Sequence, residues 1–490
     1  LAHRHIAQGI GYGPRKEWTE RALIEHERSK QKRHIPIREL LSRASAATIQ
    51  LKPCFMMSPV SVAQFLKPSV FEFDLLVVDE ASQMRPEDSL CAIARAKQFV
   101  VVGDPKQLPP TTFFDSMDIP LDDEEDEEEL VDNESILDLG MGVFRPWREL
   151  RWHYRSRHGS LIAFSNKRFY DNSLIVFPAA RHTDDDLGIS SVYIGGTYKG
   201  GRAAATRAEA KRGINEAEAE KIVEAARVFM SARQHKSFGI VTMNQGQRDL
   251  LREMLDQVSA TDSQVRAYIE RWENTLEPFF VKNLELVQGD ERDVIIISTV
   301  YGPDETRRVM QRFGPINSDV GHRRLNVLFT RAKDQVKVFT SMHPNDVRVD
   351  ENASEGVKAL RGYLEYAETG RLESGEITGR EPVNDFEFVV MEWLQELGYE
   401  VVPQVGVAGY FIDLAIRDPQ RPGSFLLGIE CDGATYHSSK SARDRDRLRQ
   451  EILGDKGWKL YRIWSTDWFN EPDQELKKLV AHIRGLLAQK

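Results

Sequence analysis

One segment, LLVVDEASQ at residues 75–83, limits the possible folds of this chain more than any other. Four consecutive apolar residues predict a short buried strand, and the acids Asp79 and Glu80 follow where that strand ends. A second apolar strand, beginning at Phe99, is followed by the polar loop GDPKQLPP. Polar groups at the ends of parallel strands mark a ligand crevice, so the sequence predicts an α/β fold with a site at this sheet edge.

An apolar strand followed by paired acids is the Walker B arrangement of P-loop nucleoside triphosphatases. Asp79 is expected to hold Mg²⁺, and Glu80 to polarise the water that attacks the γ-phosphate of ATP. Gln107, in the loop after the second strand, is placed to hydrogen-bond the γ-phosphate or the attacking water. Taken alone, the letters DEAS equally describe a strand followed by a helix N-terminus, where acids and serine are favourable caps.

Three further segments carry charged residues beside apolar strands or helices. WHYRSR contains Arg155, VQGDERD contains Glu291, and RRLNVLFTRAK contains Arg331. Glu291 is available to a ribose or a backbone group, and Arg331 is predicted to act as an arginine finger. Each segment alone is a weak signal, because an arginine beside apolar residues usually forms a surface salt bridge. All five segments in this order, at strand ends of two α/β units, indicate nucleotide chemistry.

These segments resemble the motifs of superfamily 1 helicases, in the branch of the nonsense-mediated-decay helicase and its prokaryotic relatives. DEASQ resembles motif II, GDPKQLPP motif III, HYRSR motif IV, VQGDERD motif V and RRLNVLFTRA motif VI. The resemblance covers residues 53–344 and implies two RecA-like domains that bind ATP between them, with nucleic acid across their tops. The nucleotide contacts that it implies are Asp79, Glu80, Gln107, Arg155, Glu291 and Arg331.

The chain departs from that family in two places. TMNQGQ is similar to a family segment but carries Asn244 where an aromatic residue is usual. No G-x-x-x-x-G-K-[ST] loop occurs, although such a loop supplies the amides and the lysine that hold the β- and γ-phosphates. We expect this motif upstream of Leu1, so that the full protein is an ATPase and this chain alone a poor one. The alternative is an ATP-independent relic.

The composition is that of a globular protein of about three domains at ~150 residues each. The net charge is −10, so a nucleic-acid-binding surface must be local. Three widely spaced cysteines support neither a zinc ribbon nor a disulfide framework, and we expect a reduced, cytoplasmic setting. No apolar run approaches the ~20 residues that span a bilayer, so no membrane partner is expected. The acidic run DDEEDEEE is predicted to be a solvated loop, and the start at Leu1 indicates a fragment.

The C-terminal part predicts a helix, a strand hairpin, and a further helix, strand and helix. Asp413 lies within the apolar strand GYFIDLAI, and Glu430 and Asp432 end the partner strand FLLGIECDG. A carboxylate on an apolar sheet is costly unless it is paired or metal-bound, so acids on neighbouring strands predict a Mg²⁺ site. Glu387 follows Asn384 by three residues at the start of the first helix, where a capping role is also plausible.

The stretches IECDGATYH and GWKLYRIWSTDW resemble the PD-(D/E)XK nucleases, in the branch similar to the very-short-patch repair endonuclease. The resemblance covers residues 383–468. It implies a site for Mg²⁺, or Mn²⁺, to which the helix acid Glu387 contributes with the two strand acids. An aspartate replaces the lysine of the general pattern, and a histidine is the suspected acid–base group of this branch. The residues assigned to catalysis on this basis are Asp413, Glu430, Asp432 and His437.

Together these patterns predict two RecA-like parallel-sheet domains followed by a restriction-endonuclease-like α/β domain. The expected boundaries are 1–144 for a partial first RecA-like domain, 145–349 for the second, 350–382 for a linker and 383–490 for the endonuclease-like domain. The predicted function is an ATP-dependent DNA helicase or translocase fused to a metal-dependent DNA endonuclease, in DNA repair or in defence against foreign DNA. The alternatives are a nuclease fold that only binds nucleic acid, and an RNA-directed remodelling ATPase.

Overall fold

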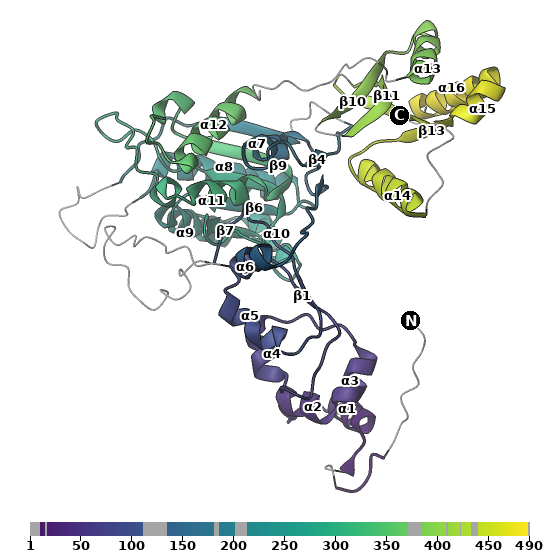
Figure 1. The fold of residues 1–490 in the computed structure, drawn as a ribbon. Helices are drawn as coiled ribbons and strands as arrows, with labels where there is room; N and C mark the ends of the chain where they lie inside the picture. The colour runs from purple at the N-terminus through teal and green to yellow at the C-terminus, as the bar shows by residue number, and fades with distance from the viewer. Residues whose placement is uncertain are drawn as a thin grey trace. The chain divides into compact units, whose positions relative to one another are not determined.

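The chain forms two compact units, residues 1–148 and 149–490 (Figure 1). The acidic run and His437, both singled out from the sequence, lie outside the residues that the structure describes. No helix among the described residues is both long enough and apolar enough to cross a membrane. The computed structural model describes residues 10–14, 17–110, 135–180, 186–200, 213–370, 382, 384–407, 410–421, 423–432 and 440–488.

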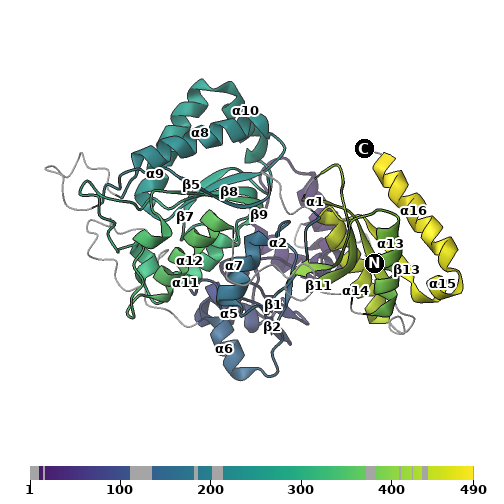
Figure 2. The same ribbon diagram turned by 90° about the horizontal axis from the view of Figure 1, so that it is seen from above.

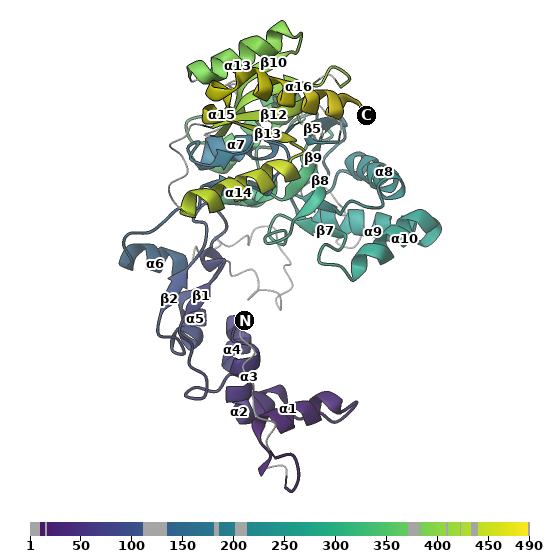
Figure 3. The ribbon, with the colours of Figure 1, turned by 90° about the vertical axis from the view of Figure 1, so that its right-hand side faces the viewer.

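The first unit is mainly helical and contains a small two-stranded parallel sheet (Figure 3). Strands β1 (Leu76–Val78) and β2 (Phe99–Val101) pair in parallel and are connected through α5 (Pro86–Ile93), as the predicted α/β order requires. The remaining elements are α1 (Glu20–Ser29), α2 (Ile37–Arg43), α3 (Ser45–Leu51), α4 (Pro59–Phe65), the 3₁₀ turn η2 (Ala81–Gln83) and α6 (Ile136–Val143).

The prediction that these strands are buried is correct for only one face of the sheet. Val78 packs with Ala81 and Ile136 in a small core. Val77 and Val100 point the other way and are 53% and 44% exposed. Because alternate residues of a strand face opposite sides, a two-stranded sheet with a core on one side leaves its other face in solvent.

The second unit contains a five-stranded, fully parallel sheet in the order β5-β9-β8-β6-β7 (Figure 2). Its two faces are covered by different sets of helices, α8, α9 and α10 on one side and α7, α11 and α12 on the other. Burial on both faces explains why the central strands are apolar along their length. The strands are β5 (Gly188–Tyr193), β6 (Phe238–Thr242), β7 (Phe280–Asn283), β8 (Arg292–Ser298) and β9 (Ala332–Thr340), and the helices α7 (Ser160–Phe169), α8 (Glu216–Ala232), α9 (Gln245–Thr261), α10 (Ser263–Glu273), α11 (Gly321–Phe329) and α12 (Glu355–Thr369).

The segment 350–382, expected to be a linker with one short helix, contains the 15-residue helix α12 in its first half. Helix α12 is buried along one side, and its Tyr363 stacks on Phe329 of α11 with ring centroids 3.4 Å apart. Glu355 at its start pairs with Arg168 of α7 at 2.5 Å. The glutamates that made this segment read as a connector lie on the solvent side of an amphipathic helix, so α12 belongs to the core of the parallel-sheet domain.

A four-stranded mixed sheet in the order β10-β11-β12-β13 forms the C-terminal part. The first two pairings are antiparallel and the last is parallel, which confirms the predicted hairpin. One face packs on α13, α15 and α16, and the other on α14 and on a small parallel strand pair, β3 and β4. The elements are β3 (Trp152–His153), β4 (Ile175–Val176), α13 (Asp385–Glu396), β10 (Val401–Val407), β11 (Tyr410–Arg417), β12 (Phe425–Asp432), α14 (Lys440–Asp455), β13 (Leu460–Trp464), α15 (Ser465–Asn470) and α16 (Pro472–Ala488).

Candidate nucleotide and metal sites

The two acids of the first unit stand immediately after β1, and both are exposed. Glu80 adopts a left-handed conformation with a φ of 52°, which residues other than glycine seldom take. Its carboxylate accepts a hydrogen bond from Gln83 Nε2 at 3.1 Å, and Asp79 Oδ1 accepts from the Glu80 N–H at 3.0 Å. Backbone conformations of this kind gather at functional sites, and this one occurs where both carboxylates follow the carboxyl end of the strand.

The loop that follows β2 meets this turn. Gly103 approaches it so closely that an added Cβ would lie 3.0 Å from the Ser82 backbone nitrogen. Within the loop, Gln107 Nε2 donates to Asp104 Oδ2 at 3.0 Å. The structure therefore brings the DEASQ and GDPKQLPP segments together at one edge of the first sheet.

In the second unit, Arg155 and Glu291 form an ion pair, with 2.6 Å between Arg155 Nε and Glu291 Oε2. The second carboxylate oxygen of Glu291 lies 3.7 Å from Lys333 Nζ. The neighbouring Arg157 donates to both oxygens of Asp334, at 2.9 and 3.1 Å. The HYRSR and VQGDERD segments thus meet the end of RRLNVLFTRAK and the adjacent Asp334 at the amino ends of β8 and β9.

Arg331, predicted as an arginine finger, is only 4% exposed. Its Nε donates to the Val327 carbonyl at 2.8 Å, and its guanidinium also contacts the Thr330 hydroxyl at 3.2 Å. The side chain must leave these bonds at the end of α11 before it can reach a phosphate. Sequence reasoning missed this packing, because an arginine after a helix can turn inward as well as outward, and the arginine finger stays a prediction.

A buried polar network, which sequence reasoning also missed, lies at the carboxyl ends of the same strands. Glu218 in the first turn of α8 accepts from the Ser298 hydroxyl at 2.6 Å and from the Val300 N–H at 2.9 Å. Val300 has a φ of 59°, which is rare for a β-branched residue. Gln247 of the TMNQGQ segment accepts from the Asn215 N–H at 2.8 Å and is fully buried, so its role here is structural.

Glu218 offers a test of this network through pH. Burial raises its pKa to about 7, so between its ordinary value near 4.5 and 7 the folded chain binds more protons than the unfolded chain. Stability is therefore expected to fall as pH rises through that window. Glu218→Gln keeps a side-chain acceptor for the Val300 N–H but has no titrating proton. The melting temperature of this variant relative to that of the wild type, measured by calorimetry, should therefore rise from pH 4.5 to 7.

The exposed Glu220 on the same helix provides the matched control. Glu220→Gln should follow the wild-type pH profile throughout. A Glu218→Gln profile parallel to that of the wild type would contradict the proposed titration.

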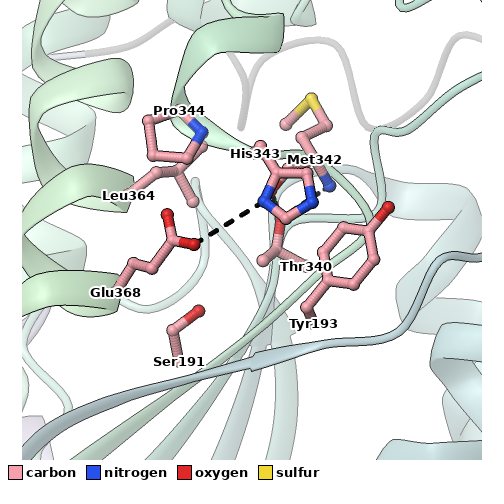
Figure 4. A pocket seen from close by; sticks show the side chains of 8 residues that line it. All are labelled: Ser191, Tyr193, Thr340, Met342, His343, Pro344, Leu364 and Glu368. Atoms are coloured by element: carbon pink, nitrogen blue, oxygen red, sulfur yellow. Dashed lines mark hydrogen bonds and ion pairs between the residues drawn. The ribbon is translucent and has the colours of Figure 1, made fainter.

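A small pocket opens at the carboxyl ends of β5 and β9 (Figure 4). His343 stacks on Tyr193 with ring centroids 4.2 Å apart, and its Nδ1 lies 3.6 Å from Glu368 Oε1. None of the residues predicted for catalysis lines this pocket. The lining residues are Ser191, Tyr193, Thr340, Met342, His343, Pro344, Leu364 and Glu368.

The two strand acids predicted for the nuclease site lie on adjacent strands. Asp413 of β11 accepts from the Cys431 N–H of β12 at 2.7 Å, and Glu430 Oε1 accepts from the Tyr410 hydroxyl at 2.9 Å. Burial and the nearby Glu430 charge raise the pKa of Asp413 to about 7, and burial also raises the pKa of Glu430. Two carboxylates in this setting repel each other, and a divalent cation would relieve that repulsion.

The other two acids of this group have protein partners. Glu387 is 3% exposed and accepts from Asn384 Nδ2 at 2.7 Å and from Gln404 Nε2 at 2.8 Å. Asn384 in turn caps α13 by accepting from the Glu387 N–H at 3.0 Å, as the capping alternative proposed. Asp432 forms an ion pair with Arg462 of β13 at 2.7 Å. A single sequence does not show that Arg462 is the partner of Asp432, because this contact depends on the register between β12 and β13.

Within the described part of the chain, no group of three or more His, Cys, Asp and Glu side chains is arranged to hold a metal ion. Mg²⁺ is commonly bound through one or two carboxylates, because it keeps several of its waters. The half-buried, mutually repelling carboxylates of Asp413 and Glu430 therefore fit Mg²⁺ or Mn²⁺ in donor chemistry and charge.

Three family models match this chain. Residues 57–115 and 134–343 each match a model described as an AAA domain, and residues 386–483 match the model REase_MTES_1575. The chain thus combines helicase-like domains with a restriction-endonuclease-like domain. Its AAA domains are of the superfamily 1 helicase type, similar to the nonsense-mediated-decay helicase.

Similar proteins are named as helicases. Over 450 residues, 88% of this chain and 38% of the relative, the chain is 30% identical to the uncharacterized ATP-dependent helicase MG140 of Mycoplasma genitalium. Its homolog in Mycoplasma pneumoniae is 28% identical, with the same shares covered. The 5'-3' DNA helicase ZGRF1 of Mus musculus is 28% identical over 55% of this chain and 13% of the relative. The chain therefore spans well under half the length of these curated relatives.

Proposed function

We propose that this chain is part of an ATP-dependent DNA helicase or translocase fused to a metal-dependent DNA endonuclease. The observation that carries the proposal is the gathering of acids at two strand positions, Asp79 with Glu80 after β1 and Asp413 with Glu430 on β11 and β12. Similarity to ATP-dependent helicases supports the first half, and similarity to a mouse DNA helicase favours DNA over RNA. The restriction-endonuclease-like domain supports the second half.

In the ATPase half, we assign Asp79 to the Mg²⁺ that accompanies ATP and Glu80 to the attacking water. Gln107 is assigned to the γ-phosphate. Because its amide already bonds Asp104 at 3.0 Å, it can exchange that partner for the phosphate and so respond to hydrolysis.

The arginines of the second unit also have partners that a nucleotide must displace. Arg155 is held by Glu291 at 2.6 Å, and Arg331 by the Val327 carbonyl at 2.8 Å. A triphosphate carries more charge than either partner, so we assign both arginines to its phosphates in the bound state. Release of Glu291 from Arg155 then frees its carboxylate for the ribose.

In the nuclease half, Asp413 and Glu430 are assigned as ligands of Mg²⁺ or Mn²⁺, with Glu387 beside them. The bound cation would supply charge stabilisation at phosphorus and a water of lowered pKa. Because the pKa of Asp413 is raised to about 7, cation binding at or below that pH is expected to release a proton from it. Asp432 and His437 are assigned to proton transfer, and Asp432 must exchange Arg462 for that role.

This pairing of activities fits DNA repair or defence against foreign DNA, an inference from architecture. A second candidate is a remodelling ATPase for RNA or DNA whose nuclease fold only binds nucleic acid. The observation that favours it is the occupation of Asp432 by Arg462 and of Glu387 by Asn384 and Gln404, which leaves fewer carboxylates for chemistry.

The two candidates differ in what the full-length protein does to nucleic acid. We expect it to nick supercoiled plasmid with Mg²⁺ or Mn²⁺ but not with EDTA, and its ATP hydrolysis to rise more with single-stranded DNA than with RNA. Intact plasmid under every condition, together with stimulation by RNA alone, would replace the first proposal with the second.

A further inference from the structure

The restriction-endonuclease-like domain packs on a short segment of the helicase-like domain, residues 151–180, which contains β3 and β4. Phe177 of this segment is completely buried. Its ring centroid lies 5.6 Å from that of Trp152 and 4.8 Å from that of Tyr410 on β11. Aromatic rings of both domains thus share one core.

Buried polar bonds close the same interface. The Lys456 ammonium, just after α14, donates to the Ser156 carbonyl, and Trp458 Nε1 donates to the Pro178 carbonyl at 2.9 Å. Lys456 is 7% exposed, and burial lowers its pKa to about 8. A buried amine without a partner is unfavourable, so these bonds favour the docked arrangement of the two domains.

Tyr410 extends from this interface to the candidate metal site. Its hydroxyl donates to Glu430 Oε1 at 2.9 Å, and only 9% of the residue is exposed. The Arg449 guanidinium of α14 lies 5.4 Å from the Tyr410 ring centroid and 6.0 Å from that of Trp152. One side chain therefore has its ring in the domain interface and its hydroxyl on a candidate metal ligand.

We propose that Tyr410 is a positioning residue for Glu430, and that the 151–180 segment holds Tyr410 in place. This inference rests on the proposed nuclease function. The hydroxyl fixes one carboxylate oxygen of Glu430 and so orients the other toward a divalent cation. Hydrogen-bond partners of metal ligands typically change metal affinity roughly 10- to 100-fold. Cation binding by the C-terminal domain then depends on a segment that also carries Arg155, a residue assigned to ATP.

Mn²⁺ binding tests this inference without requiring DNA cleavage. The full-length protein is titrated with Mn²⁺ in the absence of nucleotide and followed by calorimetry or electron paramagnetic resonance. Tyr410→Phe keeps the ring in the core and removes the hydroxyl, so we expect the Kd for Mn²⁺ to rise roughly tenfold or more while the melting temperature stays close to wild type. Phe177→Leu keeps an apolar core but removes the supporting ring, and a smaller rise in Kd is expected.

Tyr461→Phe serves as the matched control. The Tyr461 ring on β13 packs against His482, with ring centroids 5.2 Å apart, so this substitution should leave Mn²⁺ binding unchanged. Wild-type affinity in Tyr410→Phe, while Asp413→Asn no longer binds Mn²⁺, overturns the inference and leaves the nuclease proposal standing. Wild-type affinity in Phe177→Leu alone overturns the role of the 151–180 segment. If the wild-type protein binds no Mn²⁺, both proposals are wrong.

Discussion

Glu80→Gln is expected to lower the kcat for ATP hydrolysis by the full-length protein roughly 10²- to 10⁴-fold, the usual contribution of a positioned proton acceptor. The amide has nearly the same shape as the carboxylate, and its oxygen can still accept from Gln83 Nε2, which now lies 3.1 Å away. The turn after β1 should therefore keep its form, and nucleotide binding should change little. Steady-state ATPase assays give kcat, and titration with a fluorescent nucleotide gives the affinity.

The matched control is Glu87→Gln, which makes the same chemical change at an exposed position in the first turn of α5. It should hydrolyse ATP at the wild-type rate. A Glu80→Gln protein with wild-type kcat would remove Glu80 from the mechanism and leave DEASQ as a strand end and helix start. Weaker nucleotide binding at unchanged kcat would move its role from the attacking water to the Mg²⁺.

The strand-edge acids of this chain could be predicted from sequence because the signal is local. An apolar run predicts a strand, and the last apolar residue marks the carboxyl end of that strand. The polar residues that follow must lie at this end, as Asp79 and Glu80 do after β1. The hairpin that aligns Asp413 with the end of β12 was predictable for the same reason, since a turn-rich link joins two apolar runs.

The strand-end rule that located the acids of the first unit does not locate the candidate nucleotide-binding residues of the second unit. Ligands of open parallel sheets lie at the carboxyl ends of strands, yet Glu291 and Arg331 precede β8 and β9. The carboxyl ends there carry the buried network around Glu218 instead. Charged residues beside apolar segments, in the order of the helicase motifs, singled out these residues, although Glu291 and Arg331 lie before their strands and not after them.

The packing of the C-terminal domain on residues 151–180 could not be predicted from the sequence, for a different reason. Periodicity shows that a strand has an apolar face, but it does not show which element covers that face. Tyr410 and Phe177 lie more than two hundred positions apart in the chain, and each reads as ordinary core in its own segment. The same holds for Lys456, whose buried partner Ser156 belongs to another domain.

Asp413→Asn is expected to abolish Mn²⁺ binding and to lower metal-dependent DNA cleavage roughly 10²- to 10³-fold, because a bound cation supplies several kcal/mol of charge stabilisation at phosphorus. The same change should stabilise the metal-free protein. The amide oxygen can still accept from the Cys431 N–H, now 2.7 Å away, while the charge that Glu430 repels is gone. Plasmid nicking, Mn²⁺ titration and calorimetry with EDTA measure the three effects.

The sign of the stability change follows from the pKa of Asp413, which burial and Glu430 raise to about 7. Between its ordinary value near 3.8 and 7, the wild-type folded state loses stability as pH rises, and the variant does not. The gain in melting temperature should therefore be small at pH 4 and full at pH 8. Asp473→Asn, at an exposed site in the first turn of α16, should match wild type in all three assays. A variant that fails to fold properly would have a lower melting temperature. Loss of cleavage together with a higher melting temperature therefore assigns Asp413 to the chemistry. A lower melting temperature at pH 8 would instead assign Asp413 to the stability of the fold.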